Sequence, residues 1–244
     1  MYFSVYSNKG KIRNENEDSY LIKKESSPLI AVADGMGGHQ AGEVASKIAV
    51  KSLDKYLFDY QKDLLEELRV SFKSANKEII DKGKKNEDLY GMGTTLSTAI
   101  IHKNTIYIAH IGDSRIYLLR DNELKQLTTD HSLVNELLEN KEITCQEAFD
   151  HPQKNIITQA LGTAEDLKIE TKKLETLDGD RLLFSTDGLH DMLRFNEIKK
   201  NLTLDKDIEE LSKLLGEQAM NKGGNDNITL VIVDLNKTCS DGDL

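Results

Sequence analysis

Several residue types are scarce in this sequence, and each scarcity excludes a class of protein. The chain of 244 residues contains no Trp, only 2 Pro and only 2 Cys. Because so little proline leaves no Pro-rich linker, we expect one domain over residues 1–237 and a polar tail at 238–244. The two cysteines, Cys145 and Cys239, are too few for a disulfide scaffold and lack metal-site spacing. They favour a reducing compartment.

Long hydrophobic runs and an excess of positive charge are also missing. No apolar stretch approaches the length of a membrane span, and residues 1–5 lack the basic-then-apolar layout of a secretion signal. Lys and Arg number 32 against 42 Asp and Glu, which gives a formal net charge of −10. Such a surplus of acids repels the phosphate backbone of nucleic acids. We therefore expect a cytoplasmic protein that binds neither membranes nor nucleic acid.

The hydrophobic residues that are present, 38% of the chain, form short β-branched runs and longer amphipathic stretches. These two kinds of segment are grouped along the chain instead of alternating one for one. Such grouping is typical of an α+β fold with antiparallel sheets. The predicted helices cover 43–57, 64–82, 132–140, 144–149, 196–201 and 208–221, and the predicted strands cover 2–7, 19–23, 29–33, 94–101, 105–111, 114–120, 123–127, 169–174, 181–185 and 228–235.

Two neighbouring regions of the chain differ in character. Residues 94–127 contain β-branched runs joined by short polar turns, which predicts an antiparallel meander. Residues 128–163 are the least regular part of the sequence. We call them the flap segment, which is either a mobile flap or an ordinary connecting loop.

Four aspartates share one local setting. Asp34 ends an apolar run and precedes Gly35, Asp187 follows another predicted strand, Asp113 lies in a turn between strands, and Asp226 comes just before the last strand. Each of them alone is more often an ordinary turn residue than a metal ligand. If their strand ends meet at one edge of a sheet or a sandwich, the carboxylates converge on one cavity.

Converging carboxylates predict a cation site. They repel each other, so such a cluster is stable only when protons or cations neutralise it. Oxygen ligands without a Cys or His cluster favour Mg²⁺ or Mn²⁺. A pair of such ions lowers the pKa of a bridging water, which then attacks phosphorus in line without a protein nucleophile. Glu17 and Asp18, just before another strand, are further candidates for this site.

Six short motifs run through nearly the whole chain, from Arg13 to about Val233. They are RNENED at 13–18, DGMGGH at 34–39, GMGTT at 91–95, GDSR at 112–115, STDGL at 185–189 and GNDNIT at 224–229. In this order they resemble the metal-dependent protein phosphatases of the PPM family, the protein phosphatase 2C type, in its compact bacterial branch. The resemblance implies a four-layer α/β/β/α sandwich, in which helices flank two central antiparallel sheets.

The resemblance also implies an activity and its partners. The expected reaction is hydrolysis of phosphoserine and phosphothreonine by metal-activated water at two Mn²⁺ or Mg²⁺ ions per subunit, with a third, weaker ion. The expected partners are phosphorylated proteins, namely a Ser/Thr protein kinase and its substrates, and the expected state is a monomer. Two alternatives are a regulatory phosphatase acting on a phosphorylated anti-sigma antagonist and a pseudophosphatase that only binds phosphoproteins.

The motifs assign expected roles to particular residues. Asp34 is expected to bridge the two ions, and Arg13 to bind the substrate phosphate with its planar fork of donors. His39 is either the general acid or a structural residue, because Met36-Gly37-Gly38 separates it from Asp34-Gly35. The other expected metal ligands are Asp187 and Asp226 at one ion, the Gly35 carbonyl with Glu17 and Asp18 through water at the second, and Asp113 and Asp191 with Asp187 at the third.

Overall fold

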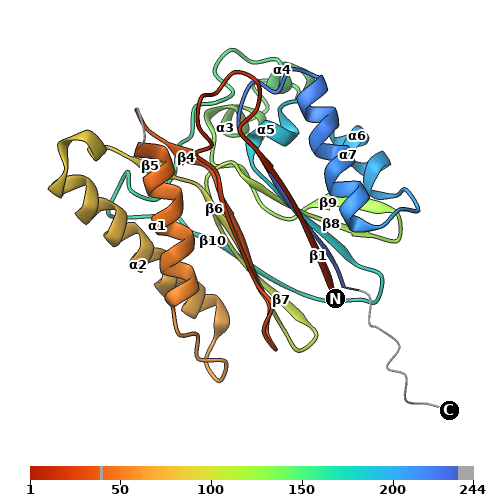
Figure 1. Cartoon of the computed structure of the whole chain (residues 1–244), viewed down its shortest axis with the longest axis horizontal. Helices are drawn as coiled ribbons and strands as arrows, with labels where there is room; N and C mark the ends of the chain where they lie inside the picture. The colour runs from red at the N-terminus through yellow and green to blue at the C-terminus, as the bar shows by residue number, and fades with distance from the viewer. Residues whose placement is uncertain (39–40, 236–244) are drawn as a thin grey trace.

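A computed structural model describes residues 1–38 and 41–235 of the chain. Two five-stranded antiparallel sheets pack face to face, and helices cover their outer faces (Figure 1). The predicted α+β fold and four-layer sandwich are thereby confirmed. The expected domain end at residue 237, the tail at 238–244 and His39 lie outside the described residues.

The first sheet has the strand order β1-β12-β11-β8-β9. The first and last strands of the described chain, β1 and β12, are therefore neighbours in this sheet. Tyr2 pairs with Asp234 and Asn8 with Ile228 along the whole length of β1 and β12. This register places the start of β12 beside the end of β1. The strands are β1 (Tyr2–Asn8), β8 (Arg115–Arg120), β9 (Glu123–Gln126), β11 (Arg181–Ser185) and β12 (Ile228–Asp234).

The second sheet has the order β10-β7-β6-β3-β2. Its strand β3 is buried along its whole length, as expected for an apolar run covered on both faces. A two-stranded ribbon, β4 with β5, extends this sheet beyond β3. The strands are β2 (Ser19–Lys23), β3 (Leu29–Ala33), β4 (Gly35–Met36), β5 (Gly93–Thr94), β6 (Leu96–His102), β7 (Thr105–Ile111) and β10 (Glu170–Glu175).

Three apolar clusters hold the layers together. One lies between the sheets and contains Ile30, Ile108 and Phe184, all almost fully buried. A second lies under α1 and α2, and a third under α6 and α7. The helices are α1 (Ala41–Lys55), α2 (Leu64–Lys85), η1 (Glu87–Leu89), α3 (Leu133–Glu139), α4 (Cys145–Phe149), α5 (Asp187–His190), α6 (Phe195–Leu202) and α7 (Ile208–Asn221).

The predicted meander over residues 94–127 is wrong at its centre. β6 pairs with β7 and β8 pairs with β9, but β7 and β8 belong to different sheets. The chain crosses between the sheets at Gly112, whose φ of +106° favours glycine. A Cβ at Gly112 would lie 2.5 Å from the Thr95 side chain, so only glycine fits this crossing. The crossing places Asp113 at the junction of the two sheets.

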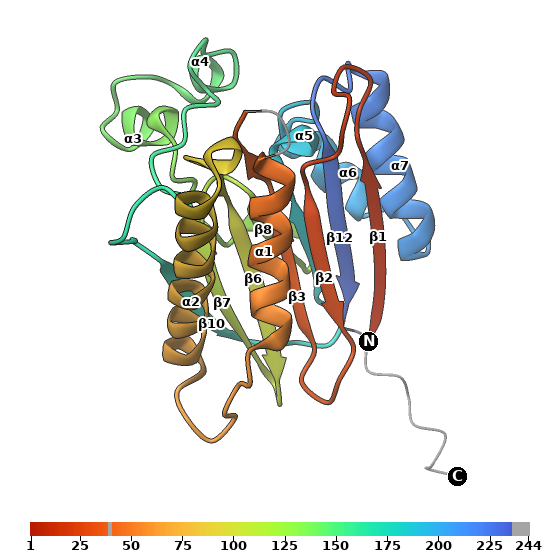
Figure 2. The same ribbon diagram turned by 60° about the vertical axis from the view of Figure 1, so that its left-hand side comes forward.

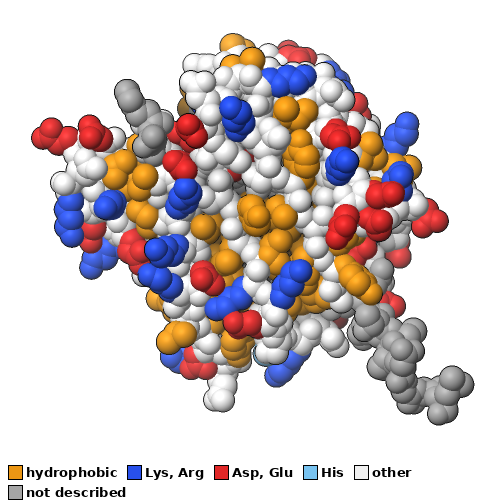
Figure 3. Space-filling view, viewed as in Figure 1, with side chains coloured by type: hydrophobic (Ala, Val, Ile, Leu, Met, Phe, Trp, Pro, Cys, Tyr) orange, Lys and Arg blue, Asp and Glu red, His pale blue; other side chains and the backbone are white. Residues whose placement is uncertain are grey.

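The flap segment contains α3 and α4, and these helices project beyond the end of the sandwich (Figure 2). An isolated bridge between Ser132 and Ile157 joins the two ends of this segment to each other, and one between Thr94 and Leu161 attaches it to β5. On the face shown in Figure 3, acidic and basic side chains are interspersed, so this face is not a uniformly basic surface. Among the described residues, no helix is both long enough and apolar enough to cross a membrane.

Candidate metal centre

The aspartates expected to bind metal come from strand ends on both sheets. Asp34 directly follows β3, and Asp187 is the first residue of α5 after β11. One residue separates Asp226 from the start of β12. Asp113 lies in the crossing from β7 to β8. Figure 1 shows β4, β5 and α5 at the same end of the sandwich. The structure therefore brings these four carboxyl groups to one end of the fold.

The electrostatics of these carboxyl groups show that they are near neighbours. Burial raises the pKa of Asp34 well above its usual range, and the charges of Asp18, Asp187, Asp113 and Asp226 raise it further. The pKa of Asp187 is also raised well above its usual range, mainly by burial and then by the charges of Asp113 and Asp226. Such groups cannot all be ionised together unless a cation compensates them.

Two further members of the cluster behave in the same way. Burial raises the pKa of Asp18 to about 7, and the charges of Asp226 and Glu17 act in the same direction. Burial also raises the pKa of Asp113 to about 7, and Asp191 adds to this shift. Carboxyl groups with a pKa near or above neutrality mark this end of the fold as a functional-site candidate.

Three carboxylate oxygens in this cluster have no hydrogen-bond partner. They are the buried Oδ1 atoms of Asp18, Asp113 and Asp187, judged against all the residues that the structure describes. A buried acceptor without a partner is costly, and a bound cation satisfies it directly. The donor set consists of carboxylates and a backbone carbonyl, which suits Mg²⁺ or Mn²⁺. The residues present therefore fit the two ions expected from the sequence.

The backbone of Asp34 is held by two buried threonines from the motif at 91–95. The Asp34 N–H donates to Thr95 Oγ1 at 2.9 Å, and the Thr94 hydroxyl donates to the Asp34 carbonyl at 2.8 Å. Thr95 N–H donates to the same carbonyl at 2.9 Å. Both ends of the Asp34 peptide are thus fixed, which orients its carboxyl group into the cluster.

Gly35 and Gly42 touch each other where β4 meets the start of α1. A Cβ on Gly35 would lie 2.1 Å from the Gly42 carbonyl oxygen, and one on Gly42 would lie 2.7 Å from the Gly35 carbonyl oxygen. A Cβ on Gly42 would also lie 2.8 Å from a Glu17 carboxylate oxygen. Gly42 thus keeps space around two groups expected at the second ion, a role that the sequence analysis did not assign.

Substitution of Gly42 by Ala is expected to weaken the second metal position. The added methyl group must push away the Gly35 carbonyl or the Glu17 carboxylate. Metal-ligand supports of this kind change affinity about 10- to 100-fold. Calorimetric titration with Mn²⁺ measures the change, and Gly38→Ala is the matched control because a Cβ there meets nothing within 4 Å. Equal affinities in the two variants would contradict this role of Gly42.

Arg13 lies at the exposed rim of the cluster. Its Nη2 donates to Asp226 Oδ2 at 2.8 Å, with the Arg13 side chain about half exposed. This hydrogen bond is the main cause that raises the pKa of Arg13, and the charges of Glu17 and Asp187 add to it. Arg13 therefore contacts Asp226, one of the expected metal ligands, while its side chain remains about half exposed to solvent.

Asn227 joins the loop that carries Arg13 to the start of β12. Its Oδ1 accepts from the Glu17 N–H at 2.7 Å, and its Nδ2 donates to the carbonyls of Lys9 and Glu15 at 3.0 and 2.9 Å. This link to the Arg13 loop does not follow from the sequence, which indicates only that Asn227 orients the neighbouring Asp226. An Asn beside a candidate ligand was its only signal in the sequence.

Gly188 and Thr186 join the remaining ligand segments. A Cβ on Gly188 would lie 2.0 Å from the Asn227 carbonyl oxygen, so the segments of Asp187 and Asp226 touch here. Thr186 Oγ1 donates to Asp18 Oδ2 at 2.9 Å and accepts from the Thr229 N–H at 3.0 Å. These contacts link β2, β11 and β12 at the carboxylate cluster.

A cleft of about 490 Å³ lies between the flap segment and the cluster. Asp113 and Asp191 line one side of it, and the flap residues Phe149 and Lys154 line another. Asp191 is held by the Lys154 ammonium at 2.7 Å. Arg115 also faces the cleft and forms a bidentate ion pair with Asp130, with contacts of 2.6 to 2.9 Å. Arg115 is therefore occupied by an internal partner.

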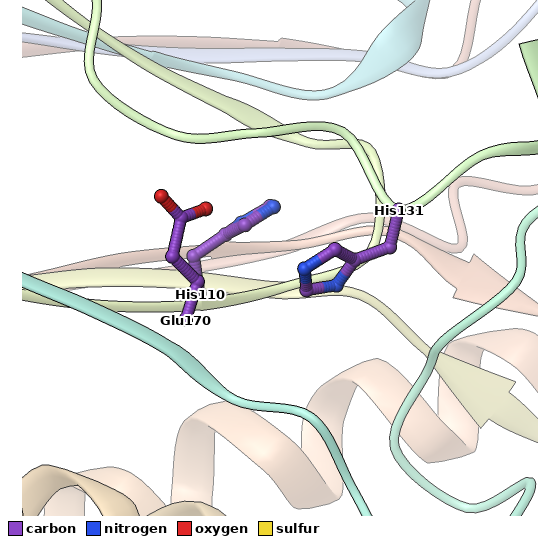
Figure 4. A group of neighbouring side chains, drawn as sticks. All are labelled: His110, His131 and Glu170. Carbon is purple, nitrogen blue, oxygen red and sulfur yellow. The ribbon is translucent and has the colours of Figure 1, made fainter. Parts of the chain in front are cut away.

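A second polar group lies beside the crossing between the sheets (Figure 4). The ligand atoms of His110, His131 and Glu170 lie within 4.8 Å of one another. His110 contacts a buried serine hydroxyl at 2.8 Å and the Thr129 carbonyl at 3.1 Å through its two ring nitrogens. His131 Nδ1 accepts from the Gly112 N–H at 3.2 Å. A metal ion bound to His110 would have to break one of its two bonds, so we interpret this group as support for the crossing.

The profile of the family described as Protein phosphatase 2C matches residues 11–223. The serine/threonine phosphatase stp of Listeria welshimeri is 40% identical over 243 residues, which cover 97% of this chain and 96% of that protein. The crystal structure of the Mycobacterium tuberculosis serine/threonine phosphatase PstP/Ppp matches with a TM-score of 0.90 and 38% identity, covering 97% and 99% of the two chains.

One further solved structure bears on the cluster. It is the catalytic domain of the serine/threonine protein phosphatase PstP in complex with two manganese ions. It matches with a TM-score of 0.87 and 35% identity, covering 97% of this chain and 98% of that one. The likeness thus extends over the whole sandwich, including all the strand ends that carry the aspartates.

Proposed function

Because the chain belongs to the protein phosphatase 2C family, we propose that it is a metal-dependent protein phosphatase that hydrolyses phosphoserine and phosphothreonine. The observation that supports this most is the group of buried aspartates with unpartnered oxygens at one end of the sandwich. Asp34 is proposed to bridge two Mn²⁺ or Mg²⁺ ions, with Asp187 and Asp226 at one of them. The Gly35 carbonyl, with Glu17 and Asp18 through water, is proposed to serve the other.

When bound, the two ions supply a water of lowered pKa as the nucleophile and offset the charge of the phosphoryl oxygens. The protein residues position these parts. Asp34 is oriented by Thr94 and Thr95, and Arg13 offers its fork of donors to the substrate phosphate at the open rim. His39, the candidate general acid, lies outside the described residues.

We propose bacterial phosphoproteins in the cytoplasm as the substrates, with the enzyme opposing a Ser/Thr protein kinase and acting as a monomer. The names of the relatives support the substrate class, and the two cysteines favour a reducing compartment. A pseudophosphatase is disfavoured because Asp34, Asp187 and Asp226 are all present at the cluster. Action on an anti-sigma antagonist has no specific support in the structure.

Hydrolysis of a phosphothreonine peptide tests the proposed function. We expect turnover with Mn²⁺ or Mg²⁺, loss of turnover in EDTA, and recovery when the ion is added back. A phosphoserine peptide from an antagonist protein, assayed in parallel, separates the main proposal from the regulatory alternative. Full activity in EDTA would contradict the mechanism, and binding of both peptides without turnover would indicate a pseudophosphatase.

A further inference from the structure

Lys154 of the flap segment reaches a residue of the candidate metal centre. Its Nζ lies 2.7 Å from Asp191 Oδ2, and the side chains are 31% and 25% exposed. Asp191 is the C-terminal cap of α5, the helix that begins with Asp187. One ion pair therefore connects the flap segment to the helix that carries a proposed metal ligand.

The ammonium group of Lys154 occupies the side of the cluster expected to hold the third ion. Asp191 is close enough to Asp113 and Asp187 to raise the pKa of both. Asp113 Oδ1 is buried without a partner among the described residues, so it remains available to a cation. Asp113, Asp191 and Lys154 all line the same cleft. The set of acids therefore fits a third ion, except that one ligand is already held by Lys154.

Among the described residues, two contacts with Arg194 also hold α4 against the rest of the protein on this side. The Arg194 guanidinium lies 4.8 Å from the centre of the Phe149 ring, and its Nη1 donates to Gln146 Oε1 at 3.0 Å. Within the flap segment itself, the Lys154 ammonium lies 5.7 Å from the centre of the same ring. Removing Lys154 from Asp191 would therefore take away one of the main links between the flap segment and α5.

We propose that Lys154 is a tethered competitor for a third metal ion at Asp191. This inference rests on the proposed function, because it takes the third ion to bind Asp191 together with Asp113 and Asp187. The Lys154 ammonium already occupies Asp191 Oδ2, so a divalent ion that takes this oxygen must displace it, because one oxygen cannot hold both positive charges at contact distance. Docking of the flap segment through Lys154 and binding of the third ion therefore exclude each other.

Mutual exclusion has consequences in both directions. The third ion weakens flap docking, and flap docking weakens the third ion by the same factor, since such coupling is reciprocal. Typical couplings between sites are about 5- to 150-fold. The two tighter ions, which do not use Asp191, should be unaffected by Lys154.

Calorimetric titration of the full chain with Mn²⁺ tests this inference, using Lys154→Gln and Lys154→Arg. We expect Lys154→Gln to bind the third ion about tenfold or more tightly than the native chain, within the usual range of coupling. The charge-retaining Lys154→Arg should bind it with nearly native affinity. Lys199→Gln is the matched control, because Lys199 pairs with Glu123 at 2.7 Å and is also 31% exposed.

Hydrogen exchange at α4 (Cys145–Phe149) provides a second readout that does not depend on activity. In the native chain, exchange should rise when Mn²⁺ is increased from a level that fills two sites to one that fills three. In Lys154→Gln it should be high already at the lower level. The inference would be overturned if Lys154→Gln bound the third ion with unchanged affinity. It would also be overturned if hydrogen exchange at α4 in the native chain did not change when the third ion binds. Absence of even two bound ions would instead overturn the proposed function.

Discussion

Replacement of Asp34 by Asn is expected to abolish turnover and, at the same time, to stabilise the metal-free protein. The neutral amide cannot bridge two ions, so we expect a fall in kcat/KM of about 10³-fold or more, equivalent to about 4 kcal/mol. The amide also removes an acid whose pKa is raised by burial and by four neighbouring aspartates. Loss of this repulsion stabilises the fold when no metal is bound.

Asp34→Asn is thus expected to lower activity and to raise the stability of the metal-free protein. A residue with a purely structural role would instead lower both when it is replaced. Thermal unfolding in EDTA at pH 8 measures the second effect, and about 1 kcal/mol corresponds to about 2–4 °C in a chain of this size. Asp187→Asn should behave in the same way, because its acid is also buried among carboxyl groups. Asp81→Asn, on the exposed face of α2, is the control and should change neither quantity. A destabilised but active Asp34→Asn protein would contradict the account.

Removal of metal is expected to make stability depend on pH in a particular direction. Burial raises the pKa of Asp18 and Asp113 to about 7, and those of Asp34 and Asp187 well above their usual range. An acid with a raised pKa stabilises the fold below its unfolded pKa, and this contribution is lost as pH rises through the folded pKa. The metal-free protein should therefore lose stability as pH rises from about 4 through 7 and beyond.

Two buried histidines oppose this trend at lower pH. Burial lowers the pKa of His110 to about 3 and that of His190 well below its usual range. Their contribution to stability rises with pH up to the unfolded value of about 6.5 and is then constant. The interval from pH 6.5 to 8.5 therefore isolates the carboxyl groups, where each proton released costs on the order of 1 kcal/mol per pH unit.

Thermal melts across this interval, with and without Mn²⁺, measure the effect. In EDTA the Tm should fall as pH rises, whereas the stabilisation by Mn²⁺ should grow because metal and protons compete for the same oxygens. Asp187→Asn should show a shallower fall in EDTA than the native chain. A metal-free Tm that rises from pH 6.5 to 8.5 would show that the aspartates are not buried together.

Sequence patterns were sufficient for the fold class and for most elements, because their apolar periodicity survives in the structure. β2 and β11 have the predicted bounds, and the α+β sandwich is confirmed. The meander failed because a polar turn in the sequence does not show whether the next strand pairs with the last one. At Gly112 the decisive fact is the nearby Thr95 side chain, which lies outside any local pattern.

The candidate site was predicted through its acids, whereas most of the contacts that support these acids were not. Asp34 and Asp187 stand beside glycine in recognisable motifs. Gly42, Asn227 and Lys154 act through contacts with segments distant in the sequence. Such contacts arise only when both sheets and the flap segment are assembled, so no spacing along the chain reveals them.

Anomalous diffraction from crystals grown with Mn²⁺ tests the central claim most directly. We predict two strong peaks about 3.5–4 Å apart, bridged by the Asp34 carboxylate. Asp187 and Asp226 should bind one ion, and the Gly35 carbonyl the other. A weaker third peak at Asp113 and Asp191 should appear only where Lys154 has left Asp191. A single peak, or peaks at His110 and His131 with none at Asp34, would contradict the account.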